Sequence, residues 1–178
     1  TFIFPVYFAG VARDHYMAQG MTPEAAGVAT QQLWGDALAL CGVIIAVLAP
    51  VLGAIADNTG RRLVWVWLFS GFYMVGAWGL WFLMPEQPNL NLAVISFGIG
   101  LIGMEFTAIF TNALLPGLAP RDEIGRLSGS GFAFGYLGGV LALAVMLLFF
   151  VENAGTGRTL LGIPPVLGLD AMLREGTR

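Results

Sequence analysis

The sequence predicts an all-α membrane protein, and three observations carry this prediction. First, 57% of its 178 residues are hydrophobic and only 11% are charged, whereas a soluble domain carries roughly 25% charged residues. Second, four long apolar stretches each approach or exceed the roughly 20 residues that an α-helix needs to cross a bilayer. Third, the sequence lacks the short alternating segments that are typical of a transmembrane β-barrel.

The four apolar stretches run over about residues 36–56, 63–84, 92–115 and 129–151. Lipid offers the peptide backbone no hydrogen bonds, so each stretch must be helical. Residues 1–12 are also apolar and follow no charged leader. We interpret them as the second half of a further span, which makes about five spans and predicts that the chain is a fragment.

Polar segments divide the chain into four expected regions. These are a partial first transmembrane helix, a non-cytoplasmic loop with a helix extension, transmembrane helices two to five, and a second non-cytoplasmic loop, over residues 1–12, 13–35, 36–151 and 152–178. The extension is predicted to begin at Thr22-Pro23-Glu24, which combines a capping hydroxyl, a proline at the first helical position and an acid in the first turn. Pro50 is expected to kink this helix.

The charged and metal-binding residues exclude several classes of function. All eight basic residues are arginines spread along the chain, so there is no basic stripe for nucleic acid. One cysteine and one histidine are too few for a dedicated zinc site, and no nucleotide-binding motif occurs, so we expect no cofactor. Arginines near the span ends weakly favour a cytoplasmic location for the turn at 53–62 and for the segment 116–128.

The turn GAIADNTGRR, residues 53–62, concentrates charge between two apolar stretches. Gly53 permits close approach of another helix, and Asp57 lies one turn further on nearly the same face. Gly60 permits the left-handed conformation that ends a helix. Arg61 and Arg62 anchor the next helix at the headgroups, and either can pair with Asp57 or with another helix. The alternative interpretation is a plain stop-transfer anchor.

The spacing G-x-x-x-D-x-x-G-R-R resembles the signature between the second and third helices of the major facilitator superfamily. It departs from that signature at Asn58, where many members carry Arg or Lys. In that family the motif latches the two halves of the transporter in the outward-facing state. The resemblance therefore implies that Asp57 faces the positive N-terminus of a helix in the second half, and that Arg61 and Arg62 join a cytoplasmic charge network with Arg121 and Arg126.

A second stretch, residues 110–139, resembles the branch that includes fungal vacuolar amino-acid effluxers and bacterial relatives of unknown substrate. Its likeness rests on Asn112-Ala113, Leu115-Pro116, Gly125-Arg126, Ser128-Gly129 and Gly135-Tyr136-Leu137-Gly138-Gly139. The stretch departs from the branch at Thr111, where an aromatic residue is usual. A full member has twelve spans. The resemblance thus implies a partial N-terminal six-helix half that stops before the sixth helix, lacks the C-terminal half, and lies in a bacterial inner membrane as a multi-pass protein.

Glu105 and Asn112 are polar residues inside the fourth predicted span, two turns apart on one face. A charge at the bilayer centre costs at least about 2.5–3.5 kcal/mol on insertion scales, so it normally faces a cavity or a partner. Glu105 is therefore either a site for a proton or a substrate ammonium group, or a structural partner of a cytoplasmic arginine. Asn112 either lines the same cavity or bridges helices. Gly131, Gly135 and Gly139 form a small-residue face that predicts close helix packing; the alternative is a face that slides during alternating access.

These features together predict a secondary active transporter that moves small solutes by alternating access. Its expected partners are the lipid bilayer, a small-molecule substrate and protons. Amino-acid efflux follows from the branch resemblance alone, and proton coupling is a hypothesis motivated by Glu105. An enzyme is not expected, since Ser130 lacks the nucleophile-elbow context and no H-E-x-x-H motif occurs. The alternative is a non-transporting receptor or scaffold, which needs no polar cavity.

Overall fold

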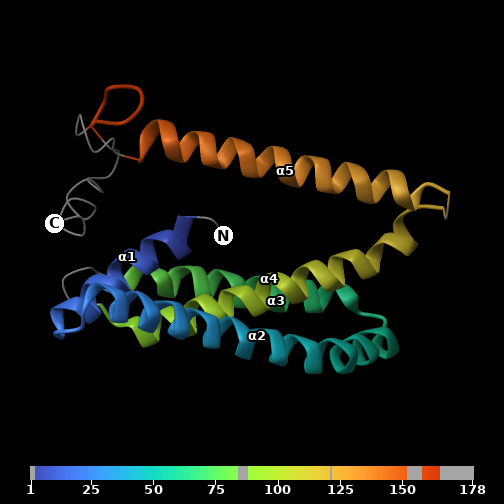
Figure 1. The fold of residues 1–178 in the computed structure, drawn as a ribbon. Helices are drawn as coiled ribbons and strands as arrows, with labels where there is room; N and C mark the ends of the chain where they lie inside the picture. The colour runs from blue at the N-terminus through green and yellow to red at the C-terminus, as the bar shows by residue number, and fades with distance from the viewer. Residues whose placement is uncertain (1–2, 84–87, 121, 152–157, 165–178) are drawn as a thin grey trace. The chain divides into compact units, whose positions relative to one another are not determined.

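A computed structural model describes residues 3–83, 88–120, 122–151 and 158–164 (Figure 1). The elements assigned in this part of the chain are α1 (Ile3–Ala18), α2 (Pro23–Thr59), α3 (Arg62–Gly79), the short 3-10 helix η1 (Leu80–Phe82), α4 (Leu90–Leu118) and α5 (Ile124–Phe149). The predicted all-α class is therefore confirmed. The chain forms two compact units, residues 1–114 and 115–178, and each is described by itself.

Within the described ranges, four helical segments are long and apolar enough to cross a membrane: α2, α3 with η1, α4 and α5. They coincide with the four predicted apolar stretches, although their ends differ. α4 runs to Leu118 and α5 begins at Ile124, so the connection expected over 116–128 is shorter than predicted. Pro116 lies inside the last turns of α4, because a proline there removes a single helical N–H and does not by itself end the helix.

α1 is longer than the sequence predicts, because residues 13–18 are helical where a loop was expected. The helix is terminated by Gly20, two residues after its last residue, Ala18, and the Gly20 φ of +93° lies in the left-handed region. The Gly20 N–H donates to the Met17 carbonyl at 2.9 Å, and the Met21 N–H donates to the Tyr16 carbonyl at 3.2 Å. This pair of bonds is a Schellman motif, so the glycine and not the first charged residue sets the end of α1.

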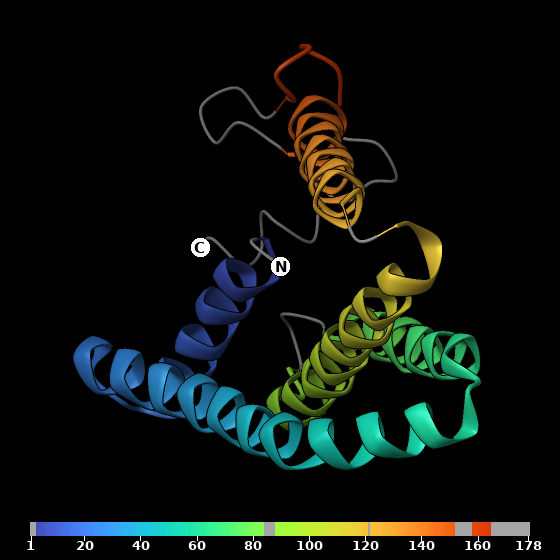
Figure 2. The same ribbon diagram turned by 90° about the vertical axis from the view of Figure 1, so that its right-hand side faces the viewer.

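α2 begins where the sequence predicts and extends well beyond the thickness of a bilayer. Thr22 accepts a hydrogen bond from the Ala25 N–H at 3.3 Å, and Pro23 occupies the first helical position. Its 37 residues span about 55 Å at 1.5 Å per residue, against a hydrocarbon core of roughly 30 Å. α2 continues through Pro50, and Figure 2 shows a helix that curves without a break.

Two apolar clusters hold the first unit together, and α4 contributes to both. One contains Phe8, Val11, Ala12, Leu83, Leu90 and Ala93, with Trp34 and Phe97 in ring contact beside it at a centroid distance of 4.6 Å. The other contains Ala56, Phe69, Phe106 and Phe110, with Trp65 packed against it. The first cluster joins α1 and the N-terminal part of α2 to α4, while the second joins the end of α2 to α3 and α4.

α3 and α4 lie in backbone contact, and glycines make this possible. A Cβ on Gly76 would collide with the backbone of Gly100 and Ser96, and a Cβ on Gly103 would lie 2.5 Å from the Tyr73 nitrogen and 2.8 Å from the Phe69 carbonyl oxygen. Small residues permit this approach between membrane helices. The two helices are therefore fixed to each other over about two turns.

The small-residue face predicted for close packing lies elsewhere, on α5. Within the described residues of its own unit, no atom lies within 4 Å of a Cβ built on Gly131, Gly135 or Gly139. The packing role of these glycines therefore stays a prediction.

Large apolar side chains on the outside of α3 point away from both clusters. Trp67 is 73% exposed and Trp78 is 71% exposed. A water-facing protein rarely exposes contiguous apolar surface of this kind, so lipid is the solvent that suits this face.

We expect Gly103→Ala to lower the thermal unfolding midpoint of the full-length protein in detergent micelles. The added methyl group would meet the α3 backbone, and overpacking of this kind costs about 1–3 kcal/mol. Gly71→Ala on α3 is the matched control, because a Cβ at Gly71 meets nothing within 4 Å. Equal midpoints for the two variants would contradict the backbone contact.

Candidate functional site

The turn between α2 and α3 is built as the sequence predicts. Gly60 has a φ of +64° and donates its N–H to the Ala56 carbonyl at 3.1 Å. This left-handed glycine ends α2, and α3 begins two residues later at Arg62. A turn this short brings the side chains of Asp57 and Arg62 together.

The guanidinium group of Arg62 binds two helix ends at once. Its Nε and Nη2 atoms donate to Asp57 Oδ1 at 3.0 and 2.6 Å, and its Nη1 donates to the Ala113 carbonyl oxygen at 2.7 Å. The planar guanidinium carries five N–H donors in fixed directions, so one arginine can serve both acceptors. Arg62 thus connects the start of α3 to the ends of α2 and α4, and we call this set of contacts the Asp57–Arg62–Ala113 junction.

The charges of the junction lie where their own helices disfavour them. Arg62 is a cation in the first turn of α3, and Asp57 is an anion in the last turn of α2. Each such placement opposes the helix dipole, an effect of about 0.3–1 kcal/mol. The ion pair and the hydrogen bond from Arg62 to the Ala113 carbonyl near the end of α4 offset this cost. The stability of the individual helices therefore does not explain these residues, whereas a bond between helix ends does.

Pro116 lies close to the acceptor of this bond. A proline has no N–H for the carbonyl four residues earlier, which is that of Asn112, and its ring crowds that carbonyl. The next carbonyl, of Ala113, accepts the bond from Arg62, as a carbonyl oxygen with two lone pairs can. The Leu115-Pro116 pair that the branch resemblance includes thus lies next to the junction.

The ion pair is exposed enough to be broken. The side chain of Asp57 is 62% exposed and that of Arg62 is 35% exposed, and ion pairs on such surfaces contribute about 0–1 kcal/mol. Arg61 is exposed, and its side chain makes no hydrogen bond to another described residue. At Gly53 a Cβ would meet nothing within 4 Å, so the described residues show no helix approaching that glycine.

Glu105 and Asn112 lie on α4, outside the junction. Glu105 is half-buried and Asn112 is exposed, and neither side chain forms a hydrogen bond or ion pair with another residue in the described part of the chain. Glu105 precedes Ala113 by eight residues, about 12 Å along the helix axis. The donors of Arg62 are directed to Asp57 and Ala113, so this arginine is not a partner of Glu105.

The loop arginines predicted to join a charge network are only partly described. Arg126 forms an ion pair with Glu123 at 3.2 Å, and its side chain is 82% exposed. Arg121 lies outside the described residues, as do 152–157 and 165–178 of the predicted final loop. The cytoplasmic charge network therefore stays a prediction.

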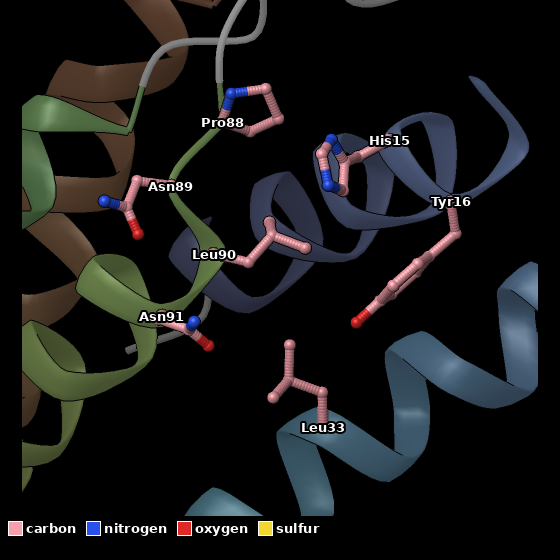
Figure 3. A pocket seen from close by; sticks show the side chains of 7 residues that line it. All are labelled: His15, Tyr16, Leu33, Pro88, Asn89, Leu90 and Asn91. Atoms are coloured by element: carbon pink, nitrogen blue, oxygen red, sulfur yellow. The ribbon is translucent and has the colours of Figure 1, made fainter. Parts of the chain in front are cut away.

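The first unit contains a cleft of about 660 Å³, shown in Figure 3, which the sequence did not predict. Its walls are His15 and Tyr16 of α1, Leu33 of α2, and the segment Pro88–Asn91 at the start of α4. No local pattern marks these residues as neighbours. The α3–α4 glycine contact was also missed, although the spacing Ser96-x-x-x-Gly100 is a recognisable small-residue signal.

Comparison with known proteins identifies the family. Residues 3–143 match the family described as Major Facilitator Superfamily, and the chain belongs to that family. A relative from Bacillus subtilis strain 168, the uncharacterized MFS-type transporter YxiO, is 27% identical over 160 residues, which cover 86% of this chain and 34% of the relative. The chain thus spans about a third of that relative's length. No solved structure gives a significant match.

Family membership confirms the predicted superfamily and the partial major facilitator fold. It also confirms an integral, multi-pass membrane protein from a family of transporters and not of enzymes. The relative bears an uncharacterised name, so the branch of amino-acid effluxers stays an expectation.

We expect a double-mutant cycle between Asp57→Asn and Arg62→Gln to give a small coupling free energy of unfolding, of about 1 kcal/mol or less. The reason is the exposure of the pair, which leaves both charges accessible to water when the bond opens. This coupling free energy is measured by unfolding the full-length protein in mixed micelles. A second double-mutant cycle on the exposed pair Glu123 and Arg126 is the matched control. A coupling above about 3 kcal/mol, the size typical of buried ion pairs, would contradict a breakable contact.

Proposed function

We propose that the full-length protein is a secondary active transporter that moves small solutes by alternating access, and that the Asp57–Arg62–Ala113 junction is its conformational latch. The observation that carries this proposal is the Arg62 guanidinium, which bonds to the ends of both α2 and α4. Membership in a transporter superfamily supports the same function. The motif residues Gly53, Asp57, Gly60, Arg61 and Arg62 then belong to the device that selects a state, and not to the solute site.

The modest strength expected of the junction suits this role. A transporter must pass between two states of similar free energy, so a contact that holds one state must be weak enough to open in each cycle. Coupling free energies of about 1–3 kcal/mol already change the ratio of two states by 5–150-fold. An exposed ion pair with one additional hydrogen bond lies at the lower end of this range.

Glu105 is our candidate for the site of a proton or of a substrate ammonium group. Its half-buried carboxyl lies inside a membrane-spanning helix and has no hydrogen-bond partner among the described residues. A carboxylate at such depth is stabilised only by water, a ligand, a cation or a bound proton. Asn112, two turns further along α4, extends the polar stripe toward the junction.

Amino acids are the proposed cargo, and efflux is the proposed direction. Both rest on the resemblance of residues 110–139 to the branch of vacuolar amino-acid effluxers, and Glu105 offers a counter-charge for an α-ammonium group. We further propose a bacterial inner membrane as the location, which the Bacillus relative supports. Protons moving down their gradient would then drive transport through protonation of Glu105.

We expect Glu105→Gln in the full-length protein to lower proton-gradient-driven amino-acid uptake into vesicles by at least about tenfold, because an amide neither releases a proton nor pairs with an ammonium group. The assay uses inverted membrane vesicles and a mixture of radiolabelled amino acids, with Glu123→Gln as the matched control at an exposed position. Unchanged uptake by Glu105→Gln would eliminate proton coupling through this residue. No uptake by the wild-type protein would eliminate the amino-acid assignment.

A further inference from the structure

We propose that the cleft between α1, α2 and the start of α4 binds a small, neutral, amphipathic solute. This site is separate from the proposed role of Glu105, and its occupancy does not depend on transport. Three properties of the cleft carry this proposal. They are its apolar floor, polar side chains with no hydrogen-bond partner among the described residues, and described lining residues that include no Asp, Glu, Lys or Arg.

The floor of the cleft is apolar and belongs to the first cluster. Leu90 is 7% exposed and is part of that cluster, and Leu33 packs against it. Pro88 adds a third apolar surface. A hydrocarbon group of a few carbons would therefore leave water here and gain roughly 25 cal/mol per Å² of apolar area buried.

The polar rim offers hydrogen-bonding groups that no described residue of the chain uses. Tyr16 is half-buried, and neither its hydroxyl nor the amide of Asn91 has a hydrogen-bond partner among the described residues. Figure 3 shows the Tyr16 hydroxyl directed into the space above Leu33, while the Asn89 side chain points away from it. Asn89 is occupied elsewhere, since its Oδ1 accepts from the Leu92 N–H at 3.0 Å.

His15 completes the rim with an imidazole ring. Its Nε2 lies 2.9 Å from the Gln19 side-chain nitrogen. The rim thus provides an imidazole, a phenol and a carboxamide, a set that recognises groups with both donors and acceptors.

The charge of the lining selects the class of solute. None of the seven described lining residues is an Asp, Glu, Lys or Arg, so a charged ligand would lose its hydration without gaining a carboxylate, ammonium or guanidinium counter-ion from them. A neutral amide or alcohol with an apolar tail suits both the rim and the floor. The cleft volume of about 660 Å³ lies within the range of about 300–1,000 Å³ that is usual for small-molecule sites.

The cleft lies far from the other two sites. Asn91 and Ala113 are 22 residues apart on α4, which corresponds to about 33 Å along the axis, close to the roughly 30 Å of hydrocarbon in a bilayer. Asn91 and Glu105 are 14 residues apart, which corresponds to about 21 Å. The cleft and the junction are thus at opposite faces of the membrane, and a solute in the cleft does not reach Glu105.

The probe for this site is N-acetyl-leucinamide, a neutral molecule with an isobutyl tail and two amides. Saturation-transfer NMR on the full-length protein in nanodiscs measures its binding, with the anionic N-acetyl-leucine as the comparison. We expect saturable binding of the amide and at least tenfold weaker binding of the acid. Asn91→Leu and Tyr16→Phe should each weaken the binding of the amide at least fivefold, and Gln31→Leu, an exposed α2 residue outside the cleft, should not.

Thermal unfolding midpoints of the variants keep the test decisive. If Asn91→Leu lowers the midpoint, Tyr16→Phe decides, since it removes a single oxygen atom. The proposal is overturned if the wild-type protein shows no saturable binding, if the acid binds as well as the amide, or if neither folded variant weakens binding. Because the readout is binding, its failure leaves the uptake experiment on Glu105 unaffected.

Discussion

In the first unit, one side chain joins the turn between α2 and α3 to the end of α4. Arg62 bonds to Asp57 at the end of α2 and to the Ala113 carbonyl of α4 while it begins α3. Only the two-residue turn at Gly60 makes this possible, because a longer connection would separate Arg62 from Asp57. A left-handed glycine, a carboxylate three residues before it and an arginine two residues after it therefore act as a single structural device.

The contacts around this device differ greatly in how easily they separate. α3 and α4 touch through their backbones at Gly76 and Gly103, where a change of spacing would lose close packing over about two turns. The end of α2 is held by Ala56 in the second apolar cluster and by an exposed ion pair. We infer that α3 and α4 move as one body, and that the α2 end is the part that can be released from it.

Local signals in the sequence predicted the helices well, but they could not predict which helices contact each other. The Thr22 cap, the start of α2 and the left-handed Gly60 follow from neighbouring residues alone, and the structure has all three. The end of α1 was placed too early because the signal, Gly20, lies after a charged turn of helix that resembles a loop in composition.

Which arginine pairs with Asp57 depends on the direction in which α3 leaves the turn, so the sequence left Arg61 and Arg62 equivalent. The cleft at His15 brings together three segments that are far apart in the chain, and no periodicity reports such a meeting.

The distance between the ends of α2 and α4 in the full-length protein is the most direct measure of whether Arg62 holds these two helix ends together. Spin labels at the exposed positions Asn58 and Thr111, in a Cys41→Ala background, allow pulsed electron double resonance to measure this distance in nanodiscs. We predict that Arg62→Gln shifts the distribution toward longer distances, while Arg126→Gln leaves it as in the wild-type protein. Identical distributions for all three proteins would show that Arg62 does not hold these helix ends together.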